Sequence, residues 1–189
     1  MLRKPAKLLL LMVAGLTIPM SHAADFYAVA GAQHSRSVKL LDVSGAGHHV
    51  GAGYVINQDW SVEVSAESLF SDAENKGITS LDSDALTLAI LGKTKLDASS
   101  VFFYRAGISQ IKHQASFYAQ PREVVAADGK TVQVRDLTTV DDKLVHGVFG
   151  FGLEQNFSDR WLGRVEIIRT FKNDEIGADS LRLSLGYRF

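Results

Sequence analysis

Eight segments of this chain alternate bulky apolar side chains with small or polar ones, and this alternation limits the fold more than any other feature. Successive side chains of a β-strand point to opposite faces, so each alternating segment predicts a strand with two different faces. Helical spacing of apolar residues is not sustained anywhere after residue 23. The expected strands cover residues 26–34, 48–57, 60–70, 84–96, 100–112, 143–156, 161–172 and 180–189.

The expected connections alternate between short and long. The short ones are polar and have the length of hairpin turns; they are 57–59, 97–99 and 156–160. The long ones are rich in Gly, Ser, Asp and Lys; they are 35–47, 71–83, 113–142 and 173–179. Short turns at one end and long loops at the other are typical of transmembrane β-barrels with an even number of strands.

The composition of the two strand faces indicates which face is outside. One face carries rows such as Leu181, Leu183 and Leu185, whereas the other carries glycines, small residues and a few charges. A narrow eight-stranded barrel has room inside only for small residues and paired charges, and its outside must be apolar to lie in lipid. The sequence therefore predicts an all-β fold, an eight-stranded antiparallel up-and-down transmembrane β-barrel. The alternative is a secreted soluble barrel of the lipocalin kind, in which the apolar rows line a ligand cavity.

Residues 1–23 have the pattern of a cleaved secretory signal peptide, with a basic start, a short apolar stretch and small residues before the cut. We expect cleavage after Ala23, so that residues 24–189 form the barrel domain. The chain has no cysteine, which excludes disulfides, thiolate metal sites and cysteine nucleophiles. Its formal net charge of -1 gives no basic excess of the kind that nucleic-acid binding requires.

Aromatic residues gather near the short-turn end, where an interfacial girdle of a membrane barrel is expected. The residues expected in the girdle are Tyr54, Trp60 and Trp161, together with Tyr27, Phe102, Tyr104, Phe157, Tyr187 and Phe189.

Two strand–turn–strand hairpins echo each other in the sequence. One reads Gly51-x-Gly53-Tyr54-x-x-Asn57-x-Asp59-Trp60, and the other reads Gly150-x-Gly152-x-x-x-Asn156-x-x-Asp159-x-Trp161. With the closing strand that ends in Phe189, these hairpins resemble the outer-membrane protein A-like barrel family. Because the chain stops at Phe189, the resemblance is to the barrel-only branch, whose members act in adhesion, in serum resistance or as structural proteins.

The resemblance also implies two sets of functional residues. Leu185, Tyr187 and Phe189 match the signal read by the outer-membrane barrel assembly machinery, although Ser184 stands where many such signals carry Gly. The interior face holds Glu63, Arg105, Glu166 and Arg182, which match the acid–base cluster that plugs the lumen in this family. We expect a structural salt-bridge network there, because buried charges must be paired; a gated proton or ion path is the alternative.

The sequence gives little support for a catalytic site or a metal site. Lipid A deacylases of the barrel kind resemble one another in a His-x-Ser motif, which places both side chains on one strand face, and this sequence does not contain that motif. His34 and Ser35 are neighbours and face apart, while His113 and Ser116 fall in or beside an expected loop. His48 and His49 are adjacent and point apart, so we interpret them as solvated loop bases. We expect no enzyme, no cofactor and no metal.

Residues 113–142 form the most distinctive expected loop, since an Asp-Gly pair between two alternating segments predicts a hairpin. Its candidate partner-contact residues are Phe117, Tyr118, Arg122, Asp128, Gly129 and Lys130. Lys112, Arg169 and Lys172 are expected near the outer rim, where they contact lipopolysaccharide phosphates or simply snorkel.

The sequence thus predicts a non-enzymatic barrel in the outer membrane of a Gram-negative bacterium, with a structural or surface-interaction role. The expected partners are outer-membrane lipids and lipopolysaccharide, the assembly machinery and an extracellular protein. A narrow pore and a lipid A-modifying enzyme are the alternative functions of a membrane barrel.

Overall fold

The structure is a computed structural model that describes residues 25–38, 44–75, 78–118, 122–125, 131–134, 137–171 and 177–189. The expected signal peptide lies outside these residues. The described strands are β1 (Phe26–Val38), β2 (Ser44–Val55), β3 (Trp60–Asn75), β4 (Ile78–Lys95), β5 (Ser100–Tyr118), β6 (Arg122–Val125), β7 (Thr131–Val134), β8 (Leu137–Asn156), β9 (Trp161–Phe171) and β10 (Gly177–Arg188).

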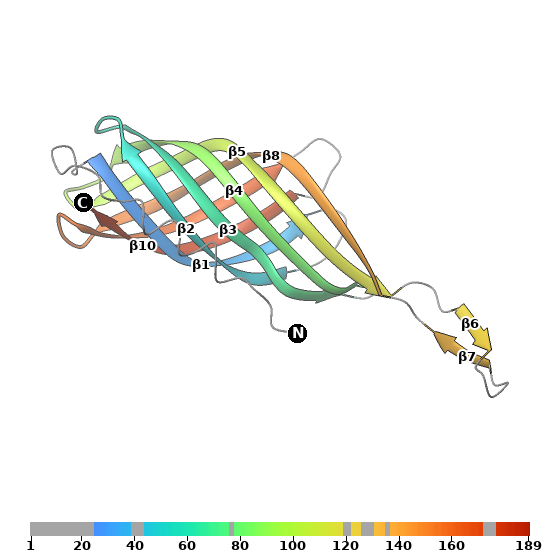
Figure 1. Ribbon diagram of the computed structural model, residues 1–189. Helices are drawn as coiled ribbons and strands as arrows, with labels where there is room; N and C mark the ends of the chain where they lie inside the picture. The colour runs from blue at the N-terminus through green and yellow to red at the C-terminus, as the bar shows by residue number, and fades with distance from the viewer. Residues whose placement is uncertain are drawn as a thin grey trace.

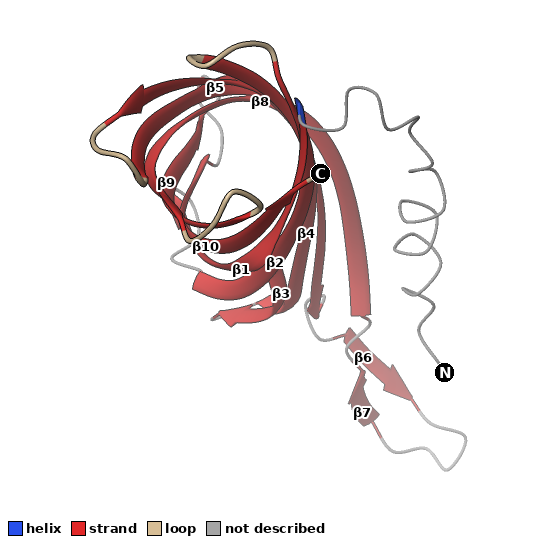
Figure 2. Cartoon of the chain, turned by 90° about the vertical axis from the view of Figure 1, so that its left-hand side faces the viewer, coloured by secondary structure: helices blue, strands red, loops and turns tan. Residues whose placement is uncertain are grey.

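Eight of these strands close a barrel in the order β1-β10-β9-β8-β5-β4-β3-β2 (Figures 1 and 2). All neighbours are antiparallel, and the first and last strands pair from Tyr27 opposite Arg188 to Val38 opposite Gly177. This closure leaves no unpaired edge along the barrel wall. The predicted eight-stranded antiparallel barrel is confirmed. Among the described residues, no helix has the length and apolar character needed to cross a membrane.

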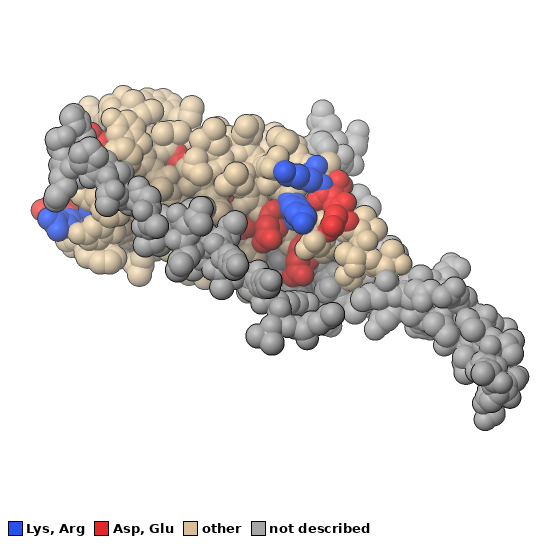
Figure 3. Space-filling view, viewed as in Figure 1, with Lys and Arg blue, Asp and Glu red and all other residues tan. Residues whose placement is uncertain are grey.

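The two faces of the strands are arranged as the alternation predicts. Outward side chains such as Leu183 and Ile108 are 59% and 57% exposed, whereas inward Arg105 and Arg182 are each 1% exposed. Figure 3 shows a largely uncharged wall with charged side chains gathered towards the ends. A soluble barrel would place the apolar rows inside, so the alternative of a lipocalin-like cavity is wrong.

The three short turns share one hydrogen-bond pattern. In each, two successive backbone N–H groups donate to the carbonyl of the residue that starts the next strand, which is Trp60, Ser100 or Trp161. A polar side chain at the same turn position accepts backbone N–H groups, and these side chains are Asn57, Asp97 and Ser158. Such short side chains favour turns because they satisfy backbone donors locally.

Several strands are longer at the long-loop end than the alternation predicts. β4 begins at Ile78 rather than 84, β5 continues to Tyr118 rather than 112, and β8 begins at Leu137 rather than 143. Above the apolar band both faces contact water, so the apolar–polar alternation fades. The backbone nevertheless stays paired, since the ladder does not depend on which side chains it carries.

The outer parts of β5 and β8 continue past the end of β9 as a ribbon, paired up to Tyr118 opposite Leu137, and β4 stays paired with β5 up to Ser116. Past its end, β6 and β7 pair as a second hairpin, from Arg122 opposite Val134 to Val125 opposite Thr131. Figure 1 shows this small hairpin well outside the barrel end. The ribbon and hairpin expected from residues 113–142 are thus present.

Candidate functional site

The lumen is filled by a connected series of alternating carboxylates and cations, here called the ion-pair chain. Glu63 on β3 lies at its centre. Its Oε1 lies 2.5 Å from Nη2 of Arg105 on β5, and its Oε2 lies 2.7 Å from Nη1 of Arg164 on β9. Tyr27 on β1 donates its hydroxyl to the same Oε2 at 2.9 Å. One carboxylate therefore joins four strands of the barrel.

The chain continues from Arg105 through Glu166 to Arg182. Arg105 Nε lies 2.6 Å from Glu166 Oε1, and Arg182 Nη1 lies 3.8 Å from Glu166 Oε2. Arg182 is held more firmly by Glu67 on β3, at 2.7 Å, and by Gln33 on β1. Glu166 makes no hydrogen bond of good geometry through Oε1, so it is the least firmly held carboxylate of this series of ion pairs.

Towards the short-turn end the chain runs from Arg164 to Glu154. Arg164 Nε donates to Glu154 Oε2 at 2.8 Å, and Arg188 Nη2 donates to Oε1 at 2.6 Å. Lys93 Nζ lies 3.7 Å from the same carboxylate. The carboxyl groups thus each contact at least one cation, as buried charges require.

The structure brings all four residues singled out in the sequence into this chain, namely Glu63, Arg105, Glu166 and Arg182. Sequence reasoning missed the partners Glu67, Glu154, Arg164, Arg188 and Lys93. All five share the inward parity of their strands, which is the signal that could have found them. Parity alone does not reveal which residues stand at the same height.

Tyr27 is placed differently from the sequence expectation. The residue is 1% exposed and points into the lumen, so its assignment to the interfacial girdle is wrong. Its ring lies over Gly53, where an added Cβ would come within 2.1 Å of ring carbon Cζ. The absence of a side chain at Gly53 lets the ring lie flat against the wall and reach Glu63.

The other aromatic residues of the short-turn end do face outward. Tyr54, Trp60 and Trp161 are 38–51% exposed. Their rings contact Phe26 at 4.9 Å, Tyr104 at 5.9 Å and Tyr187 at 5.0 Å between centroids.

The residues expected to be the assembly signal lie at the closing seam. Leu185 and Phe189 are exposed on the outer face, and the Tyr187 ring lies 5.4 Å from that of Phe189. The Phe189 N–H donates to the carbonyl of Phe26 on β1, at 3.0 Å.

Two interpretations of the histidines are wrong. His49 is not a solvated loop base, because β2 already begins at Ser44 and His49 points into the lumen with its Nε2 3.0 Å from Ser184 Oγ. His113 lies on β5 rather than in a loop, and its Nδ1 is 2.7 Å from Ser83 Oγ on β4. His48 is exposed on the outer face, and His34 and Ser35 face apart as expected.

The outer ribbon has one edge that no described strand covers. β9 ends at Phe171, opposite Gly147, so residues 137–145 of β8 pair with β5 on one side only among the described residues. Phe117 and Tyr118 end β5, and Arg122 begins β6. Asp128, Gly129 and Lys130 lie outside the described residues.

Charged residues surround the outer end of the barrel wall. Asp84, Lys112 and Lys143 are exposed neighbours on β4, β5 and β8. Arg169 makes a bidentate ion pair with Asp179, at 2.6 Å for both contacts. Lys172 lies outside the described residues. No group of His, Asp or Glu among the described residues is arranged to hold a metal ion.

Comparisons with known proteins agree with this geometry. Residues 8–189 match the family model of the outer membrane protein beta-barrel domain. Among solved structures, the attachment invasion locus protein Ail of Yersinia pestis is 18% identical with a TM-score of 0.57, covering 88% of this chain and 99% of Ail. Neisserial surface protein A is 12% identical with a TM-score of 0.67, covering 87% and 97%. No curated protein sequence matches the chain.

OprG of Pseudomonas aeruginosa, another outer membrane protein, is 11% identical with a TM-score of 0.53 and covers 89% of this chain and 97% of its own. At these identities the structural likenesses show the fold, while the family match extends over nearly the whole chain. The protein belongs to the outer membrane protein beta-barrel family and is located in the outer membrane of a Gram-negative bacterium.

Proposed function

We propose that this protein is a non-enzymatic surface-interaction barrel, whose outer ribbon binds an extracellular protein and whose ion-paired lumen serves only to hold the barrel closed. The observation that carries the proposal is the one-sided strand pairing of residues 137–145, which lie beyond the end of β9, among the described residues.

An unpaired strand edge presents backbone N–H and C=O groups to any extended segment that approaches it. Val140 and Val145 add exposed apolar surface to this edge, at 49% and 54% exposure. The opposite edge of the ribbon is occupied up to Ser116 by β4. A partner strand would therefore add on the β8 side, where backbone hydrogen bonds supply affinity and alternate side chains supply specificity.

The ribbon is also held in a defined shape. Gln114 donates to Asp141 at 2.7 Å, and the hydroxyls of Ser116 and Thr139 lie 3.2 Å apart across it. Ordering the edge before binding lowers the entropic cost of association.

The lumen supports a structural role rather than conduction. The guanidinium groups of Arg105, Arg164 and Arg182 are held by carboxylates from other strands, and each residue is at most 5% exposed. An ion that crosses the lumen would have to separate these pairs.

The Ser83–His113 hydrogen bond is the contact that most resembles a catalytic pair. Ser83 is 0% exposed, however, so an ester substrate cannot reach its hydroxyl without displacing the wall. This burial supports a non-enzymatic role.

The experiment is adhesion of bacteria that express the protein to a monolayer of cultured epithelial cells. In the first variant an Asn-Gly turn replaces residues 119–136 and joins the paired residues Tyr118 and Leu137. In the second, Val140→Lys and Val145→Lys place charges on the edge, which opposes strand addition. Asp84→Asn, on the exposed wall of the barrel, is the matched control.

We expect the wild-type protein and the control to confer adhesion, and both ribbon variants to lose it while still folding, as judged by heat-dependent migration in electrophoresis. Equal adhesion of the ribbon variants and the wild type would refute the proposal, and so would a wild-type protein that confers none.

A further inference from the structure

The three short turns are built alike but differ in charge at their capping side chain. Asn57 Oδ1 accepts two backbone N–H groups at 2.9 Å, and Asp97 Oδ1 accepts those of Ser99 and Ser100 at 2.7 Å. Since a neutral Asn caps one turn in the same way, the turn fold does not require the charge of Asp97. The backbone N–H of Ser99, with further hydrogen bonds from Ser100, lowers the pKa of Asp97 to about 2, so this carboxylate is ionised at neutral pH.

The aromatic girdle is interrupted beside this same turn. The other two turns are each followed by a tryptophan, Trp60 or Trp161, whereas Ser100 occupies the corresponding position here. Ser100 donates its hydroxyl to Gln155 Oε1 at 2.9 Å instead of covering the outer wall.

A second interruption lies on β9. Gly163 faces outward and has no side chain, and a Cβ added there would come within 2.8 Å of the Phe157 ring. Ser100 and Gly163 together leave the outer wall hollow between β5, β8 and β9.

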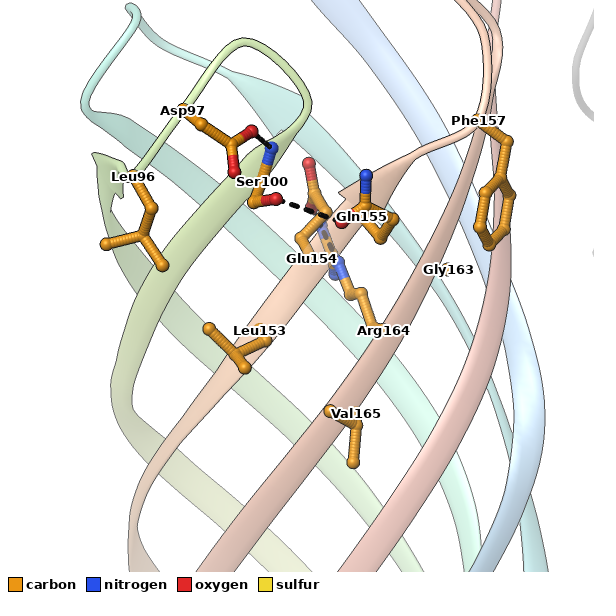
Figure 4. Close-up of a pocket in the computed structure, with 10 residues that line it drawn as sticks. All are labelled: Leu96, Asp97, Ser100, Leu153, Glu154, Gln155, Phe157, Gly163, Arg164 and Val165. Carbon is orange, nitrogen blue, oxygen red and sulfur yellow. Dashed lines mark hydrogen bonds and ion pairs between the residues drawn. The ribbon is translucent and has the colours of Figure 1, made fainter.

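The hollow is a groove of about 460 Å³ at the short-turn end of the barrel (Figure 4). Leu96, Leu153, Phe157 and Val165 supply its apolar lining, and Asp97 and Gln155 lie at its polar end. Arg164, on the lumen side of the lining, is neutralised by Glu154 at 2.8 Å and Glu63 at 2.7 Å. The charge left over in the groove is therefore that of the Asp97 carboxylate; Lys95, two residues earlier, is not part of the lining.

We propose that this groove binds one phospholipid of the periplasmic leaflet whose headgroup carries a primary ammonium. An acyl chain packs against Leu153 and Val165, and the ammonium donates to the carboxylate of Asp97. The short turns of outer-membrane barrels face the periplasm, so the polar end of the groove lies at headgroup level. An ammonium complements the anionic end of the groove, whereas an anionic headgroup would be repelled by it.

The test is native mass spectrometry of the full mature barrel in detergent, titrated separately with phosphatidylethanolamine and with phosphatidylcholine of the same acyl chains. These lipids differ in whether the ammonium can donate hydrogen bonds. An exposed ion pair with a hydrogen bond predicts that the wild type binds the ethanolamine lipid roughly two- to fivefold more tightly.

Two variants separate the parts of the groove. Asp97→Asn keeps a capping oxygen, as Asn57 does in its turn, and should lose the headgroup preference while retaining weaker binding of both lipids. Gly163→Val fills the groove and should lose both lipids; if it does not fold, Gly163→Ala, whose Cβ already meets the Phe157 ring, replaces it. Asp59→Asn and Ala52→Val, which lie outside the groove, are the matched controls and should bind as the wild type does.

Heat-dependent migration in electrophoresis confirms that each variant is folded. A wild type without preference for the ethanolamine lipid would overturn the proposal. So would an Asp97→Asn variant that keeps the preference, or a folded groove-filling variant that binds both lipids like the wild type.

Discussion

Glu63→Ala is expected to be the most destabilising single change in the lumen. The side chain contacts Arg105, Arg164 and Tyr27, and removing it leaves two buried guanidinium groups with fewer carboxylate partners. Removing one partner of a buried ion pair costs about 3–5 kcal/mol, because the remaining charge stays desolvated. With a urea dependence of about 2 kcal/mol per molar, this loss lowers the unfolding midpoint by about 2 M.

The assay is urea unfolding of the barrel from lipid vesicles, followed by tryptophan fluorescence. Glu166→Ala is the internal comparison, and it should lower the midpoint less, since Arg105 and Arg182 keep their closer contacts with Glu63 and Glu67. Asp84→Ala, on the exposed wall, should change stability by less than about 0.5 kcal/mol. Unchanged midpoints for both Glu63→Ala and Glu166→Ala would refute the idea that the lumen pairs hold the barrel together.

Three further changes test other parts of the structure. Gly53→Ala should lower the free energy of unfolding, measured in urea, by about 1–3 kcal/mol, because its methyl group pushes Tyr27 away from Glu63 inside a closed lumen. Gly92→Ala should lower it less, since the Tyr104 ring that the new methyl group meets lies on the lipid side and can turn away. The pKa of Asp97, about 2 against an ordinary 3.8, predicts a contribution to stability that is present above about pH 4 and lost as the pH falls towards 2. The difference in urea midpoint between the wild type and Asp97→Asn should therefore shrink over that pH window. A constant difference would contradict the lowered pKa of Asp97. Phe189→Ala should reduce the amount of heat-modifiable barrel in the outer membrane by a larger factor than it reduces the stability of the purified protein. Unchanged assembly in cells would exclude Phe189 as part of the assembly signal.

The fold was largely predictable because alternate residues of each strand in a membrane barrel face two different environments, the lipid and the lumen. Leu181, Leu183 and Leu185 identify the lipid face, and Arg182 between them identifies the lumen face. The outer ends of β4, β5 and β8 were not predictable in the same way, since successive residues there, such as Asp141 and Asp142, are both exposed and give no contrast between the two faces.

The sequence predicts which residues belong to the lumen site, but it does not predict which of them contact one another. Parity places Glu63 and Arg164 inside the barrel, yet their contact joins residues 101 positions apart on β3 and β9. Which inward residues stand at one height depends on the stagger between strands, and stagger is a property of the closed barrel rather than of any one segment. Tyr27 was misplaced for a related reason: its proximity to the aromatic end outweighed its own inward parity.

The ion-pair chain has a consequence for how the barrel assembles. Because side chains alternate faces, shifting one strand against its neighbours by a single residue would turn its lumen charges towards lipid. A lipid-facing Arg or Lys costs roughly 2–4 kcal/mol at the middle of the bilayer, and β9 carries Arg164 and Glu166 on the same face. These charges thus penalise a one-residue misalignment of β9, so the residues that stabilise the finished barrel also disfavour this wrong register during insertion.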